Sequence, residues 1–378
     1  MVLKKICILA DFPTGALEGD MAGRGGGHAA TWLPQLAKAW ENQKAFEIHW
    51  CVLDARMSNT VSKQCWNQYF HKLPCPSVTT SMLLLRWPQR LIYRKIFQQI
   101  SPDLVHCWGT ETLHGAALFE FKAPSILSMQ GVITTCFKTG DLQGWRWKLF
   151  RRWEPTSMRK ASLITCESQW GMDQVNSIVP GKRMNRVEYG VFPSFYQVSW
   201  QPDSRVPRIL FVGGLNRLKG IDLLISMLRD YPSLPWKLVF AGAGYLAEEL
   251  RTLNHPSVEL LGTLKTNQVQ EEMSKAWALV HPSRADTSPN VVKEARVIGL
   301  PVIGSPNGGH AEYIEHGKDG FIVDSDNPDD WFAALNQLGT DYNLCRQMGA
   351  LNHQSYREYF RPEKTAEEFL NLYREMLS

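Results

Sequence analysis

Short runs rich in valine, isoleucine and leucine recur along the whole chain, and segments of helical periodicity separate them. This alternation is typical of βα units, in which helices cover a parallel sheet. The strands expected in the first half lie at 5–10, 47–53, 103–109, 125–130, 162–168 and 186–191. Those expected in the second half lie at 208–214, 237–244, 258–262, 277–283, 301–305 and 321–325. Six strands in each half predict an α/β fold with two Rossmann-like, doubly wound domains.

The polar segment at 195–208 contains two prolines and is interpreted as the linker between these domains. The predicted domains are therefore residues 1–198 and 199–355, followed by a helical tail at 356–378. In open parallel sheets, ligands bind beyond the carboxyl ends of the strands. Two such sheets facing each other would form a cleft, so the loops after the strands should carry the functional residues.

Composition narrows the class of protein. The 378 residues are 44% hydrophobic and 21% charged, which is typical of a globular chain. The start, "MVLKKICILADFP", lacks the cleavage site of a signal peptide, and we expect a cytoplasmic protein. The eight cysteines form no C-x-x-C pair, so we expect reduced thiols. A net charge of +4 is too small to indicate a nucleic-acid partner.

Basic and aromatic residues alternate in two segments, 83–95 and 144–160. A basic, aromatic helix face can lie on an anionic membrane surface. The same pattern also fits an amphipathic helix whose aromatic side chains pack into its own domain. Both interpretations remain open from the sequence, and the first would make this a peripheral protein on the inner face of the plasma membrane.

Two strand ends in the second half carry glycines. In "FVGGLNRLKG", Gly213 and Gly214 allow close backbone approach, while Arg217 and Lys219 place positive charge at a helix start. These residues favour an anionic group such as a diphosphate, although an ordinary βα turn is an equal alternative. In "FAGAG", Gly242 and Gly244 would leave room for a flat base or a ribose, which is a weak signal alone.

The stretch "RADTSPNVVKEARVIGLPVIGSPNGG" is the most informative one in the chain. Ser288 is predicted to cap a helix that begins at Pro289. The backbone amides of residues 290–292 would then be available to an anion. Asp286 and Glu294 flank this helix end, where carboxylates could bind hydroxyl groups. Either acid taken singly could instead stabilise the helix dipole or belong to a solvated face.

These motifs resemble, in order and spacing, the retaining nucleotide-sugar glycosyltransferases of family 4, which have the GT-B fold. The resemblance covers residues 208–326 and is specific as a set. In the first half "GRGGGHAATWLPQLAKAW" (23–40), "PDLVHCWGTE" (102–111) and "SLITCESQWGMDQV" (162–175) give a looser match. The resemblance implies two Rossmann-like domains across a cleft, with the last helix returning to the first domain.

The resemblance also implies roles for the donor-binding residues. Glu294 stands at the second acid of the E-x7-E signature, which binds the nucleotide ribose. Asp286 stands at the first acid, which meets the transferred sugar, and it is one methylene shorter than the usual glutamate. Lys219 matches the phosphate-binding lysine, and the backbone of Asn290, Val291 and Val292 would hold the diphosphate. Gly214 occupies the position of the family's usual arginine, a departure for which Arg217 is a candidate to compensate.

In the first half the resemblance is carried by residues near the donor phosphates and the acceptor. Gly26 and Gly27 match the loop over the phosphates, and Gly25 and His28 lie on its acceptor side. Gln130 stands after a strand where many relatives have a histidine that reaches the donor sugar. His114 is a weaker acceptor-site candidate. His106 and His281 are expected to be structural histidines with satisfied hydrogen bonds.

The implied reaction is transfer of a sugar from a nucleoside diphosphate to a glycan or lipid-linked acceptor, with retained anomeric configuration. Lys219 and Asp286 are the catalytic candidates, and no nucleophilic side chain is required. No D-x-D motif precedes a glycine loop, so neither a metal nor a cofactor is predicted. By analogy the setting is bacterial surface polysaccharide or glycolipid synthesis. The alternatives are a GT-B sugar-nucleotide epimerase and a non-enzymatic nucleotide-sugar-binding relative.

Overall fold

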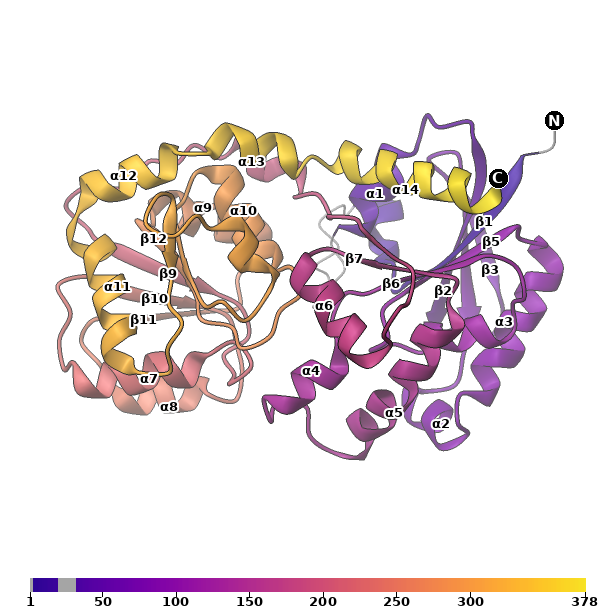
Figure 1. Ribbon diagram of the computed structural model, residues 1–378, viewed down its shortest axis with the longest axis horizontal. Helices are drawn as coiled ribbons and strands as arrows, with labels where there is room; N and C mark the ends of the chain where they lie inside the picture. The colour runs from indigo at the N-terminus through magenta and orange to yellow at the C-terminus, as the bar shows by residue number, and fades with distance from the viewer. Residues whose placement is uncertain (1–2, 20–31) are drawn as a thin grey trace. The chain divides into compact units, whose positions relative to one another are not determined.

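The computed structural model describes residues 3–19 and 32–378, which form two compact units (Figure 1). The first unit comprises Met1–Phe137, Leu142–Gly190 and Pro362–Ser378. The second comprises Lys138–Asp141 and Val191–Arg361. Each unit is built on its own sheet, as the alternation of apolar runs predicts.

The first unit contains a sheet in the order β3-β4-β2-β1-β5-β6-β7-β8. Its strands pair in parallel except β3 and β4, which are antiparallel. The strands are β1 (Lys4–Leu9), β2 (Phe46–Asp54), β3 (Val61–Cys65), β4 (Gln68–Pro74), β5 (Leu104–Trp108), β6 (Ser125–Ser128), β7 (Leu163–Cys166) and β8 (Met184–Arg186). The helices are η1 (Thr14–Glu18), α1 (Leu33–Ala39), α2 (Val78–Leu83), α3 (Trp87–Ile100), η2 (His114–Phe119), α4 (Ile133–Lys138), α5 (Trp145–Lys160), α6 (Gln169–Ile178) and α14 (Pro362–Leu377).

The second unit contains a fully parallel sheet in the order β11-β10-β9-β12-β13-β14. The strands are β9 (Arg208–Val212), β10 (Lys237–Ala241), β11 (Val258–Gly262), β12 (Ala278–His281), β13 (Val302–Gly304) and β14 (Gly320–Ile322). The helices are η3 (Pro193–Gln197), α7 (Ile221–Asp230), α8 (Ala247–Leu253), α9 (Thr266–Lys275), α10 (Asn290–Ile298), η4 (Gly309–Tyr313), α11 (Pro328–Thr340), α12 (Tyr342–Ala350) and α13 (His353–Tyr359).

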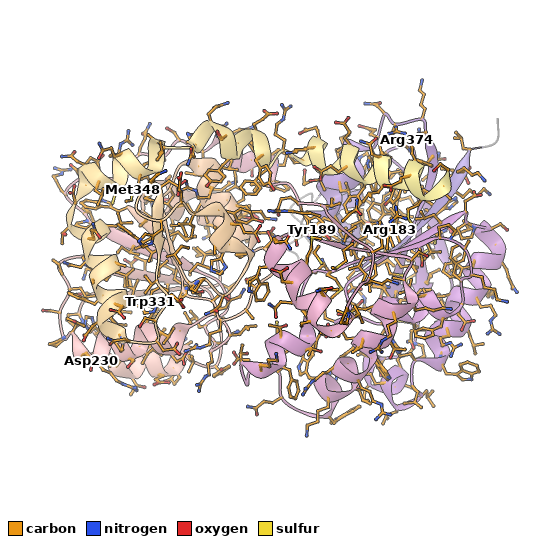
Figure 2. All side chains as sticks on the ribbon, in the orientation of Figure 1. Arg183, Tyr189, Asp230, Trp331, Met348 and Arg374 are labelled. Atoms are coloured by element: carbon orange, nitrogen blue, oxygen red, sulfur yellow. The ribbon has the colours of Figure 1, made fainter. Side chains whose placement is uncertain are left out.

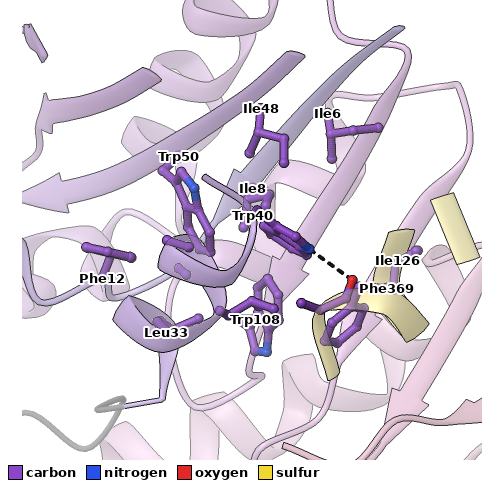
Figure 3. Packing of buried hydrophobic residues seen from close by; sticks show 14 of the residues in the cluster. Ile6, Ile8, Phe12, Leu33, Trp40, Ile48, Trp50, Trp108, Ile126 and Phe369 are labelled. Carbon is purple, nitrogen blue, oxygen red and sulfur yellow. Dashed lines mark hydrogen bonds between the residues drawn. The ribbon is translucent and has the colours of Figure 1, made fainter. Parts of the chain in front are cut away.

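Helix α14 belongs to the core of the first unit although it is the last element of the chain. The indole nitrogen of Trp40 donates a 2.9 Å hydrogen bond to the carbonyl of Ala366, and Phe369 packs in the same cluster (Figure 3). The hydroxyl of Tyr373 lies 2.8 Å from a ring nitrogen of buried His106, whose other nitrogen lies 2.6 Å from Ser128. His106 is therefore a satisfied structural histidine, as predicted.

A buried ion pair organises the second unit. Arg296 of α10 and Asp319 are both buried, and their side chains lie 2.7 Å apart. Asp319 also accepts hydrogen bonds from Asn352 (3.0 Å) and from the hydroxyl of Tyr356 (3.2 Å). These contacts join α10 to the segment before β14 and to α13.

Apolar packing holds the opposite part of the second unit. Trp331 of α11 and Met348 of α12, both labelled in Figure 2, belong to one buried cluster with α7 and the sheet. The two helices therefore form part of the second unit's core.

The structure corrects two boundaries. The predicted domain limit at 198/199 lies at Gly190/Val191, because Val191 and Phe195 pack into a core cluster of the second unit. The terminal segment predicted to start at 356 passes to the first unit only at Pro362, because Phe360 is buried in that same cluster.

The strand predictions have two errors. The expected strand at 186–191 is absent, and β8 ends at Arg186. The antiparallel pair β3 and β4 was not predicted, because β3 is almost entirely exposed and lacks an apolar run.

Two further expectations can be compared with the described residues. None of the eight cysteines forms a disulfide, in agreement with the prediction of reduced thiols. Within residues 3–19 and 32–378, no helix is long and apolar enough to cross a bilayer.

We predict that Phe369→Ala lowers the free energy of unfolding of the first unit by about 3–5 kcal/mol, because it leaves a cavity under α14. Urea denaturation followed by tryptophan fluorescence measures this change. Glu367→Ala on the exposed face of the same helix is the control, with an expected change within about 0.5 kcal/mol. Equal midpoints for the two variants would show that α14 contributes little to the core.

Candidate active site

Lys219 and Asp286 form an ion pair at the carboxyl edge of the second sheet. Lys219 lies in the loop between β9 and α7, and Asp286 lies in the loop between β12 and α10, elements labelled in Figure 1. Their side chains are 24% and 15% exposed, so the pair is largely screened from water yet still accessible. The structure therefore brings the two catalytic candidates into direct contact.

Glycines of the neighbouring loop fix the backbone of Asp286. Its carbonyl accepts a 2.9 Å hydrogen bond from the amide of Gly309, and Asp286 forms an isolated parallel bridge with Gly308. A Cβ atom on Gly308 would lie 2.6 Å from the same carbonyl oxygen. The closeness of these two segments requires glycine at 308, which explains the first of the two glycines in the motif.

The environment of Asp286 keeps its carboxylate ionised. Burial alone would raise the pKa of Asp286, but the positive charge of Lys219 and the proximity of His281 hold it well below its usual range. Asp286 is therefore a charged hydrogen-bond acceptor at neutral pH, and it is not placed to act as an acid.

Two buried histidines lie beside this pair. His281 ends β12, and its Nε2 lies 3.6 Å from Oδ2 of Asp286, beyond hydrogen-bond distance. His310 packs edge-on against it, with ring centroids 4.9 Å apart. Burial lowers the pKa of both imidazoles, that of His310 to about 3. Both are therefore neutral at physiological pH.

The prediction that His281 is satisfied by hydrogen bonds is wrong. Among the described residues, neither of its ring nitrogens has a hydrogen-bond partner, and the same holds for Nδ1 of His310. His310 was not identified from the sequence, where its only signal is its position directly after Gly308 and Gly309. Polar atoms buried without partners often mark a site that serves function rather than stability.

The N-terminus of α10 differs in detail from the prediction. The N-cap residue is Pro289 and no side chain caps the helix, because the Ser288 hydroxyl shares a 2.9 Å hydrogen bond with Tyr313. The amide of Val292 donates to the carbonyl of Pro289 at 3.1 Å. Asn290 and Val291 remain in the first turn, where amides have no intrahelical acceptor. Of the three backbone amides predicted to bind an anion, we therefore retain those of Asn290 and Val291 and drop that of Val292.

Glu294 lies one turn further along α10 and is buried. Arg296 of the same helix pairs with Asp319, which precedes β14, and this ion pair holds the helix in place. The donor-binding predictions Asp286, Asn290, Val291 and Glu294 thus occupy one loop and the first half of one helix.

The predicted glycines and Arg217 have structural roles that the sequence did not show. A Cβ atom on Gly242 would lie 1.8 Å from the carbonyl oxygen of Gly213, so backbone packing already requires glycine there. Arg217 is exposed and lies 3.6 Å from Asp222, which also pairs with Arg284. The side chain of Arg217 is therefore directed to Asp222.

The described candidates of the first half, Gln130 and His114, lie in the first unit. Gly25, Gly26, Gly27 and His28 fall outside the described residues. Gln130 follows β6 and is partly buried. His114 is buried, with one ring nitrogen 2.9 Å from Asp11 and the other 2.8 Å from the hydroxyl of Tyr93.

His114 lines a cavity of about 540 Å³ within the first unit. Asp11, Leu53 and Glu111 also line it and follow or end strands β1, β2 and β5, so the cavity lies at the carboxyl edge of the sheet. Burial raises the pKa of Glu111 to about 7, and its Oε2 has no hydrogen-bond partner among the described residues. Asp11 and Glu111 were not predicted as site residues from the sequence.

No group of three or more histidine, cysteine, aspartate or glutamate side chains is arranged to hold a metal ion in residues 3–19 and 32–378.

Part of the second unit is similar to a known family of proteins. Residues 206–341 match the family model described as Glycosyl transferases group 1. The D-inositol 3-phosphate glycosyltransferase of Paenarthrobacter aurescens is 29% identical over 224 residues, which cover 55% of this chain and 53% of that protein. The chain spans about half the length of the curated relatives it matches.

Solved structures match over nearly the whole chain. Sucrose-phosphate synthase from Thermosynechococcus elongatus has a TM-score of 0.79 at 17% identity and covers 99% of both chains. Anabaena HepE in complex with UDP and glucose has a TM-score of 0.71 at 14% identity, covering 98% of this chain and 100% of that one. At this identity the structural likeness shows the fold.

We predict that His310→Leu makes stability less sensitive to acid. In the unfolded chain His310 takes up a proton near its ordinary pKa of 6.5, whereas the folded protein resists protonation down to about 3. The contribution of His310 to the free energy of unfolding is therefore complete above pH 6.5. It is lost as the pH falls from 6.5 toward 3. Between pH 7 and pH 5 the loss is roughly 2 kcal/mol.

Urea unfolding at pH 7 and pH 5 measures this difference, and His310→Leu should reduce it by about that amount. Replacing the exposed His316 with leucine is the matched control. If wild type and His310→Leu lose the same stability between the two pH values, then His310 is not held neutral by burial.

Proposed function

We propose that this chain is a GT-B glycosyltransferase of the family 4 type, and that it transfers a sugar from a nucleoside diphosphate to an acceptor hydroxyl with retained anomeric configuration. One observation carries the proposal. The Lys219–Asp286 ion pair lies in the same unit as the uncapped first turn of α10, which follows Asp286 by only a few residues. A cation, helix-end amides and an ionised carboxylate are the groups that a sugar diphosphate needs.

The chemistry assigns a role to each of these groups. The bond between the anomeric carbon and the diphosphate oxygen breaks, and Lys219 with the amides of Asn290 and Val291 stabilises the charge that develops on the leaving group. The acceptor oxygen bonds to the anomeric carbon on the same face, and a donor phosphate oxygen takes its proton. No side-chain nucleophile and no metal ion take part in the proposed reaction.

The carboxylates bind hydroxyl groups at either end of the diphosphate. Asp286 remains ionised beside Lys219 and accepts hydrogen bonds from the transferred sugar, while Glu294 accepts them from the ribose. Because Asp286 contacts Lys219 directly, the two act as a unit: phosphates that approach Lys219 bring the attached sugar to Asp286. The short aspartate side chain is therefore expected to influence which sugar is accepted.

The acceptor is proposed to bind in the first unit, in the cavity lined by His114. The carboxyl groups of Asp11 and Glu111 can bind hydroxyl groups there, and Trp147 offers an aromatic face to a sugar ring. We propose a glycan or lipid-linked acceptor, as used in bacterial surface polysaccharide or glycolipid synthesis. The enzyme would then work on the cytoplasmic side, in contact with an anionic membrane surface.

We predict that Lys219→Ala weakens binding of nucleoside diphosphate at least about tenfold, because a charge-assisted contact to phosphate is lost. Asp286→Ala should keep nucleoside diphosphate binding and lower transfer at least about 100-fold, because the sugar is no longer oriented. Calorimetric titration with UDP and GDP measures the first effect. A panel of nucleotide sugars and acceptors, with the product anomer identified by NMR, measures the second.

Lys275→Ala, which removes an exposed lysine of α9, is the control and should change neither quantity. Failure of the wild type to bind any nucleoside diphosphate at millimolar concentration would contradict the proposal. Conversion of the donor sugar without an acceptor would indicate an epimerase instead. Donor binding without turnover under any condition would indicate a binding protein.

A further inference from the structure

Apolar side chains are concentrated on the surface where α2 ends and α3 begins. Of the twelve exposed large hydrophobic residues in the described part of the chain, six lie between 78 and 91. Leu83, Leu84 and Leu85 are 69%, 53% and 67% exposed, and the exposed Trp87 and Leu91 follow them. We call these five residues the leucine turn. Clustered exposed apolar groups of this size mark an interaction surface.

The backbone holds the leucine turn in this exposed position. Leu85 and Arg86 both have left-handed backbone conformations, with φ of 51° and 65°. The amide of Leu85 donates to the carbonyl of Met82 at 3.0 Å, and that of Arg86 donates to Ser81 at 2.8 Å. The Arg86 side chain is buried, with its guanidinium 4.3 Å from the Trp153 ring centroid. The buried Arg86 side chain therefore holds the turn against Trp153, while the three leucines are exposed to solvent.

The neighbouring helix α5 is strongly basic. It carries six arginine and lysine residues, all exposed, and one acid, Glu154, so its net charge is 6 − 1 = +5, more than the +4 of the whole chain. Glu154 is buried and accepts hydrogen bonds from Thr110 and from backbone amides. It therefore does not offset the positive surface. An anionic partner is the complement of this charge.

The leucine turn and α5 belong to one surface of the first unit. Besides the Arg86–Trp153 contact, Met82 and Phe150 share a buried cluster, against which Trp147 and Trp153 also pack. Figure 1 shows α2 and α5 next to each other. The aromatic side chains of α5 thus pack mainly into their own unit, and the exposed apolar groups come from the leucine turn. Of the two interpretations left open for 144–160, internal packing describes Trp147, Phe150 and Trp153, whereas Trp145 is exposed.

This surface adjoins the acceptor cavity. Val78, at the start of α2, and the α5 residues Trp145 and Arg146 all line that cavity, and Val78 and Trp145 are themselves exposed. A molecule that entered the cavity past these residues would come from the side that carries the leucine turn and the basic helix.

We infer that the leucine turn inserts into the interface of an anionic lipid bilayer, with the bases of α5 on the headgroups, and that the cavity takes its acceptor from that bilayer. Apolar side chains flanked by lysine and arginine are the combination that such an interface binds. The part of this inference that concerns the acceptor rests on the proposed function. Membrane binding itself does not, and it is measured without any sugar donor.

The test uses the full chain and the triple variant Leu83→Gln/Leu84→Gln/Leu85→Gln. Co-sedimentation is measured with vesicles of phosphatidylcholine alone and of phosphatidylcholine mixed with phosphatidylglycerol. The wild type should bind the mixed vesicles more tightly, and the triple variant should lose at least about tenfold in affinity for them. Leu351→Gln, at an exposed leucine of the second unit, is the matched control and should bind like the wild type.

A second variant, Arg151→Gln/Arg152→Gln, distinguishes the electrostatic attraction of α5 to the headgroups from the insertion of the leucine turn. It should reduce binding to the mixed vesicles and leave the weak binding to neutral vesicles unchanged. Far-ultraviolet circular dichroism and nucleoside diphosphate affinity, which should match the wild type, show that each variant is folded.

The inference is overturned if the triple variant binds the mixed vesicles like the wild type, or if neutral and anionic vesicles bind equally. It is also overturned if the wild type binds no vesicle and the triple variant instead changes the oligomeric state, because the leucine turn would then be covered by a second copy. Vesicle binding without transfer to any acceptor would contradict the proposed function and leave the membrane surface supported.

Discussion

The buried ion pair between Arg296 and Asp319 is the interaction on which the candidate donor site depends. It fixes α10, and with it the position of Glu294 and of the amides that begin the helix. Asp319 is bound in turn by Asn352 and Tyr356, so α10 is tied to the last helix of the second unit. Removing one partner of such a buried pair typically costs about 3–5 kcal/mol, because the other charge remains without compensation.

A second ion pair, Lys219–Asp286, differs because it stays partly accessible. It lies beside two buried, neutral histidines, and charges in such partly buried surroundings interact more strongly than in water. The histidines add no charge of their own at neutral pH. The arrangement therefore offers one fixed cation and one fixed anion, a preorganised setting for a ligand that carries phosphates and hydroxyl groups.

The fold could be predicted largely from the sequence, because buried parallel strands are continuous apolar runs. The strands β1, β5, β9, β10 and β12 illustrate this. The exposed strand β3 carries no such signal. The domain boundary was misplaced because Val191 and Phe195 are apolar residues whose partners lie far away in the sequence.

The site was predictable where one motif holds its residues, as in Asp286, Asn290, Val291 and Glu294. The site was not predictable where its geometry depends on contacts between side chains that are far apart in the sequence. Tyr313 forms a hydrogen bond with Ser288, so the serine does not cap α10. His281 lies against His310 only because β12 and η4, the short helix after β13, fold together. Gly242 was interpreted as part of a ligand site. A side chain at this position would collide with the carbonyl oxygen of Gly213, so backbone packing alone requires glycine there. Such contacts depend on tertiary packing, which local sequence patterns do not encode.

The central claim is that the loop containing Lys219 and the start of α10 bind a nucleoside diphosphate. Hydrogen exchange with mass spectrometry, with and without saturating UDP or GDP, tests it most directly. The account predicts slower exchange in segments 213–220 and 286–294, and unchanged exchange in helix α9, which the proposed site does not include. Protection confined to other segments, or no protection by any nucleoside diphosphate, would contradict it.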